Sequence, residues 1–124
     1  MGTPTIVPQW YDGDYVKRAS PSVNVAELDS VLASFLSRVG KVHTFLFGRA
    51  LEITSGNDGN HVAGSAHGKN KAVDLRSHDL ADDEQALFTA VMLYAARGFK
   101  VAVFDERYTA SPHWHVQTAD SVGG

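Results

Sequence analysis

Residues 53–76 read ITSGNDGNHVAGSAHGKNKAVDLR, and this stretch organises the rest of the chain. Residues 55–71 within it hold four glycines and three asparagines, which is typical of a loop. Connections in small domains are usually much shorter, and long ones are commonly functional or disordered. Residues 72–75 then have the pattern of a short strand. The stretch therefore predicts a long loop that leads into a strand.

The residues before this stretch predict a helix followed by a strand. Asn24 with Glu27 three positions later has the pattern of a capping box, and apolar residues then recur at steps of three and four. We expect an amphipathic helix over residues 25–39, with Gly40 as its C-terminal stop. Residues 50–54 predict a strand, and the pattern assigns no element to the segment just before it.

The residues after the stretch predict one more helix and two more strands. From Asp79 the chain places acidic residues in a first turn and apolar residues on one face, which predicts a helix that ends before Gly98. Residues 100–104 and 113–118 predict strands joined by a loop over 107–112. The order of elements predicts an α+β fold, with a small, mainly antiparallel sheet that carries the candidate site and helices packed on its other face.

Length and composition predict one domain that spans residues 1–124. The chain has 44% apolar and 20% charged residues, which suits a single core. Residues 1–23 carry three prolines and several apolar anchors, so we expect an arm packed on the domain. The net charge of -3 is spread along the chain, which excludes a basic nucleic-acid-binding face. We expect a monomer.

The N-terminus predicts neither a secretory signal nor a membrane-spanning helix, because its first twenty residues contain no apolar run. If the target is extracellular, we expect another component to deliver the protein or to carry it as a module of a larger assembly.

Histidine and aspartate supply the candidate metal ligands. The chain has no cysteine, so histidine, aspartate and glutamate are the strong candidates for holding a transition metal. His67 ends the long loop, Asp74 lies on the strand that follows, and His113 and His115 share one face of the last strand. We predict that His67, Asp74 and His115 bind one zinc and leave a fourth position open, as in catalytic zinc sites.

The other histidines have no partner at metal-ligand spacing, and we expect solvated side chains for His43, His61 and His78. Two histidines and a carboxylate also occur in non-haem iron oxygenases. Those sites usually have one residue between the first histidine and the acid, whereas six residues separate His67 from Asp74. The spacing therefore argues against that class.

Three short motifs carry a family resemblance: Ser65-Ala66-His67, Ala72-Val73-Asp74 and His113-Trp114-His115. Over residues 50–118 the chain resembles the zinc peptidases that cut peptidoglycan stem peptides. These are the D-Ala-D-Ala carboxypeptidases and the L-alanyl-D-glutamate endopeptidases of phage endolysins, and lysostaphin-type enzymes and the Hedgehog signalling domain have a similar site. The resemblance implies a peptidoglycan peptide as substrate and a zinc held by His67, Asp74 and His115.

The resemblance also implies a catalytic acid just before the last ligand strand. Asp105 and Glu106 are the candidates, and strand alternation sends them to opposite faces. We choose Glu106 as general base because similar sequences often have glutamate there. His113 is expected to stabilise the oxyanion of the tetrahedral intermediate, and Trp114 to face the core.

Two departures from the family pattern keep an alternative function open. Asn70 stands where the family usually has glycine, a mild change because asparagine tolerates positive φ. Asn57 and Asp58 stand where an arginine is common, which removes a possible substrate contact. The alternative is therefore a zinc-containing binding module of a phage or cell-wall assembly with impaired catalysis. The identity of the bond that is cut stays open. Arg49, Arg76 and Arg107 could each bind a substrate carboxylate, and the alternative for each is an ordinary ion pair at the surface.

Overall fold

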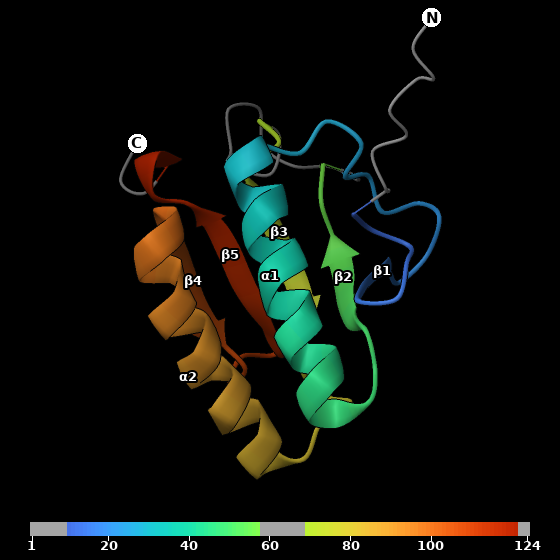
Figure 1. Cartoon of the computed structure of the whole chain (residues 1–124), viewed down its shortest axis with the longest axis vertical. Helices are drawn as coiled ribbons and strands as arrows, with labels where there is room; N and C mark the ends of the chain where they lie inside the picture. The colour runs from blue at the N-terminus through green and yellow to red at the C-terminus, as the bar shows by residue number, and fades with distance from the viewer. Residues whose placement is uncertain (1–9, 58–68, 122–124) are drawn as a thin grey trace, which may run out of the picture.

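The computed structural model describes residues 10–57 and 69–121 and contains a sheet covered by two helices (Figure 1). The elements in chain order are β1 (Val16–Arg18), α1 (Ser30–Phe47), β2 (Leu51–Ser55), β3 (Ala72–Arg76), α2 (Asp82–Phe99), β4 (Val101–Glu106), β5 (His113–Thr118) and a 3-10 turn (Ala119–Ser121). In the described part of the chain, no helix has the length and apolar character needed to cross a membrane.

The sheet has the strand order β1-β2-β3-β5-β4, and all its pairings are antiparallel except the parallel pairing of β1 with β2. Both helices pack on the same face of this sheet (Figure 1). The predicted α+β class with a mainly antiparallel sheet is therefore confirmed. The predicted arm supplies β1, whose short parallel pairing to β2 extends the sheet at one edge.

The helix-covered face of the sheet is apolar because alternate residues of each strand point into the core. Leu75 on β3, with Trp114 and Val116 on β5, is fully buried there. The predicted core position of Trp114 is confirmed: its ring packs edge-on against Phe88 of α2, with centroids 5.4 Å apart. Its indole N–H donates to the Thr89 hydroxyl at 2.8 Å, so burial leaves no unpaired donor.

The predicted bounds of the first helix were wrong, because α1 begins at Ser30 and ends at Phe47. Asp29, not Asn24, caps it, since the Asp29 carboxylate accepts from the backbone N–H of Val31 at 2.9 Å. The Asp29 N–H also donates to the Asn70 carbonyl at 2.8 Å, which ties the start of α1 to the residues before β3.

Gly40 lies inside α1 and does not end it, whereas Gly48, with φ of 71°, forms the C-terminal cap. A Cβ on Gly40 would lie 2.5 Å from Cγ2 of Val16 and 2.8 Å from the carbonyl oxygen of Tyr15. Glycine at this position therefore lets α1 approach β1 closely.

We expect Gly40→Ala to lower the free energy of unfolding by about 1–3 kcal/mol, because the Tyr15 backbone and the Val16 side chain must move to admit the methyl group. Gly98→Ala in α2 is a matched control, because nothing lies within 4 Å of its added Cβ. That control should raise stability by about 0.5–1 kcal/mol, since alanine favours helix. Denaturant unfolding measures both changes, and equal effects would contradict the close approach at Gly40.

The second helix and the later strands lie close to their predicted positions. α2 begins with acidic residues at Asp82, three residues after the predicted start, and runs through Gly98 to Phe99, two residues beyond the predicted end. β5 has the predicted bounds, whereas β4 begins one residue later than predicted and extends two residues further, to Glu106. β2 begins and ends one residue later than predicted, and β3 ends one residue later.

His43 contradicts the expectation of a solvated side chain, because it is 3% exposed on the inner face of α1. Its Nδ1–H donates to the Arg49 carbonyl at 2.7 Å, and its ring packs edge-on against Phe47 and Phe88. Burial disfavours the charged imidazolium and lowers the pKa of His43 below its ordinary value of 6.5. His78 is exposed, as expected, and His61 lies outside the described residues.

The lowered pKa of His43 predicts that this residue destabilises the fold in acid. The unfolded chain takes up the proton more readily, so the contribution of neutral His43 is present above pH 6.5 and is lost as pH falls below it. We expect the free energy of unfolding to fall less steeply between pH 7 and pH 5 in His43→Leu than in the parent. The difference in slope is at most about 1.4 kcal/mol per pH unit for one proton. Denaturant unfolding at several pH values measures both proteins, and an equal pH dependence of the free energy of unfolding in the two would contradict the prediction.

Candidate functional site

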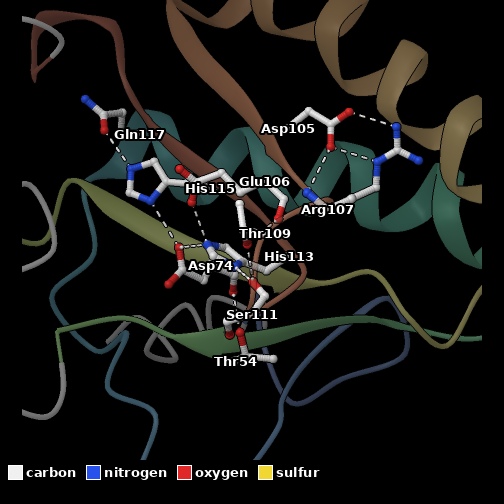
Figure 2. Close-up of polar contacts among 10 residues, drawn as sticks. All are labelled: Thr54, Asp74, Asp105, Glu106, Arg107, Thr109, Ser111, His113, His115 and Gln117. Carbon is white, nitrogen blue, oxygen red and sulfur yellow. Dashed lines mark hydrogen bonds and ion pairs between the residues drawn. The ribbon is translucent and has the colours of Figure 1, made fainter.

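The candidate site lies on the sheet face that the helices leave uncovered, on β3, β4 and β5 (Figure 2). Antiparallel pairing puts Asp74 opposite His115, and it puts His113 opposite Glu106. Directly paired residues of neighbouring strands project from the same face, so these four side chains gather together. Their neighbours along β3 and β5, which are Val73, Leu75, Trp114 and Val116, are buried in the core instead.

Asp74 and His115 meet directly across the β3–β5 pairing. Oδ1 of Asp74 lies 3.0 Å from Nδ1 of His115 and 3.5 Å from Nε2 of His113. The three side chains are about one-fifth exposed, so solvent reaches them from one side only. The carboxylate therefore faces two imidazole rings in a partly desolvated position.

His113 and Glu106 form a second close pair beside the first. Nε2 of His113 lies 2.7 Å from Oε1 of Glu106, and Nδ1 of His113 lies 2.5 Å from the Ser111 carbonyl oxygen. A carbonyl only accepts, so Nδ1 carries a hydrogen. Nε2 of the same ring therefore faces the Glu106 carboxylate, and the two side chains form a close polar pair next to Asp74 and His115.

Asp105 is directed away from these residues, in agreement with the expected alternation. It pairs with Trp114 in the register and forms a two-pronged ion pair with Arg107, at 2.8 and 2.7 Å. The hydrogen bonds from Arg107 hold the pKa of Asp105 below its ordinary value. Of the two candidate acids, Glu106 is the one that reaches the histidines.

Gln117 is a member of the site that sequence reasoning missed. Its Oε1 lies 2.6 Å from Nε2 of His115, two residues earlier on the same face of β5 (Figure 2). Burial lowers the pKa of His115, but hydrogen bonds with Asp74 and Gln117 outweigh burial and the net pKa is raised. The i, i+2 spacing on a strand was a signal that could have found Gln117.

Asp74 and His115 fit a shared zinc ion as two of its ligands. Zinc bonds of about 2 Å at tetrahedral angles place ligand atoms roughly 3.4 Å apart, close to the separation of these two atoms. His67, the third predicted ligand, lies outside the described residues, so the structure describes only two of the three predicted zinc ligands. Within residues 10–57 and 69–121, no group of three or more His, Cys, Asp or Glu side chains could hold a metal ion.

The three arginines considered for substrate binding each pair with an acid of the chain. Nε of Arg76 lies 2.7 Å from Glu52, Arg49 lies 3.8 Å from Asp79, and Arg107 binds Asp105. These contacts match ordinary ion pairing at a surface.

Two of the residues that depart from the family pattern lie in the described part of the chain. Asn70 has φ of 62°, a conformation that asparagine tolerates. The Asn57 N–H donates to the Asn24 carbonyl at 2.8 Å. Asp58 lies outside the described residues.

No family model, no curated protein and no solved structure matches the chain.

Proposed function

We propose that this protein is a zinc-dependent peptidase that cleaves the stem or cross-link peptides of bacterial peptidoglycan. The observation that carries the proposal is the 3.0 Å approach of Asp74 to His115 beside the Glu106–His113 pair, all on one sheet face. The resemblance of the three motifs supports the substrate class. A carboxylate and an imidazole that converge on one point, next to a second carboxylate–imidazole pair, are the parts that metal-assisted hydrolysis needs.

His67, Asp74 and His115 would hold the zinc. When bound, zinc supplies Lewis acidity that polarises a substrate carbonyl and lets water attack near neutral pH. The partly buried position of Asp74 and His115 strengthens their attraction for a cation, because solvent screens them less.

Glu106 would act as the general base. Its side chain is 42% exposed, so it can reach both the histidine pair and a substrate that arrives from solvent. The carboxylate takes a proton from the attacking water and delivers it to the leaving amine. The contact with His113 holds the carboxylate at the edge of the site while it does so.

His113 would stabilise negative charge on the substrate oxygen. The Ser111 carbonyl orients its ring, so Nε2 is held beside Glu106, and a hydrogen on Nε2 would donate to the substrate oxygen there. A donor that is positioned before the reaction begins stabilises the oxyanion without reorganisation at that moment.

The test is to measure the zinc content of the purified protein and the release of new amino groups from purified peptidoglycan. One zinc per chain with amine release that a chelator stops is the expected result. Zinc without cleavage would favour the binding-module alternative, and absence of both would overturn the proposal.

A further inference from the structure

Gln117 contacts His115 at the ring nitrogen opposite the one that faces Asp74. Oε1 of Gln117 lies 2.6 Å from Nε2, and Oδ1 of Asp74 lies 3.0 Å from Nδ1. The cross-strand neighbours of Gln117 are Ala72 on β3 and Ala102 on β4. Small residues on both sides leave room for the Gln117 side chain to extend along β5 toward His115.

This contact determines which nitrogen of His115 can bind a cation. An amide oxygen only accepts, so the Nε2 that faces it must carry the hydrogen. In the hydrogen bond with Asp74 the hydrogen lies between Nδ1 and the carboxylate, and a cation beside Asp74 would take its place and bind the Nδ1 lone pair. A ring turned by 180° would lose both contacts, so the two acceptors also define the ring orientation.

We propose that Gln117 is a positioning residue that holds His115 in the orientation and tautomer needed for metal binding through Nδ1. The inference rests on the proposed zinc site. Partners of this kind matter because a metal-binding histidine usually donates its second N–H to a fixed acceptor, and losing that acceptor typically weakens metal binding about 10- to 100-fold.

The test compares zinc affinity, measured by competition with a chelator, in four proteins. Gln117→Leu removes the acceptor and should bind zinc about 10- to 100-fold more weakly than the parent. Gln117→Glu keeps an acceptor oxygen and should restore the parental affinity. Thr54→Val is the matched control, because Thr54 donates to the Asp74 carbonyl at 3.3 Å without contacting His115, and it should bind zinc like the parent.

A second readout follows the Nε2–H of His115 by proton–nitrogen NMR of the zinc-loaded proteins. The proton should exchange slowly with water in the parent and in Gln117→Glu, and rapidly in Gln117→Leu. If Gln117 only stabilised the fold, its replacement would not selectively change the exchange rate of the His115 Nε2–H. If Gln117→Leu is too unstable to purify, loss of the slow proton in Gln117→Met supports the inference and its persistence overturns it.

The outcomes separate the two proposals. A parent that binds no zinc overturns the proposed function itself. A parent that binds one zinc, together with a folded Gln117→Leu of equal affinity and an equally slow Nε2–H, overturns only the role of Gln117.

Discussion

Glu106→Gln is expected to slow the cleavage of peptidoglycan peptides by about 100- to 10,000-fold, the usual cost of removing a positioned acid–base group. Glutamine keeps the shape of the side chain but cannot take a proton from water. The zinc content should stay at the parental value, because Glu106 is not among the proposed ligands. Amine release and elemental analysis on the same preparation measure both quantities.

Asp105→Asn is the matched control for this variant. Asp105 is the preceding residue, and it binds Arg107 instead of the site histidines. Asp105→Asn should therefore retain most of the parental cleavage rate. A fully active Glu106→Gln with an inactive Asp105→Asn would show that the base lies one residue earlier on β4.

His67→Ala and His115→Ala are each expected to reduce zinc from about one ion per chain to far below one, because a catalytic zinc depends on three protein ligands. Peptide cleavage should disappear with the metal. Ligands must be deprotonated to bind, so zinc affinity of the parent should also fall as pH drops through the histidine range. Elemental analysis after dialysis provides the measurement.

His61→Ala is the matched control, because His61 lies in the same glycine- and asparagine-rich stretch and has no assigned role. It should keep zinc and activity. Stoichiometric zinc in His67→Ala would refute the ligand assignment, and loss of zinc in His61→Ala would place the third ligand at that residue.

Much of the sheet follows from local pattern. Alternation along 113–118 predicts that Trp114 is buried and that His113 and His115 share the opposite face, and the structure agrees. The same alternation separates Asp105 from Glu106. These predictions succeed because a strand has a period of two residues wherever it lies.

The bounds of α1 and the environment of His43 depend on contacts between distant segments. The Asp29 N–H at the start of the helix is bound by the Asn70 carbonyl, and Gly40 lies inside the helix at a point where Tyr15 and Val16 leave no room for a side chain. His43 is buried because α2 packs over it through Phe88. A local capping pattern or a lone glycine cannot report such contacts.

The sequence alone determined the α+β class, the strand faces and the candidates for metal binding and acid–base chemistry. Only the tertiary structure decided that Asp74 meets His115 at 3.0 Å and that Gln117 reaches the other side of the ring. The physical reason is the β3–β5 register, which joins residues 41 positions apart, and a shift of one residue would turn Asp74 away.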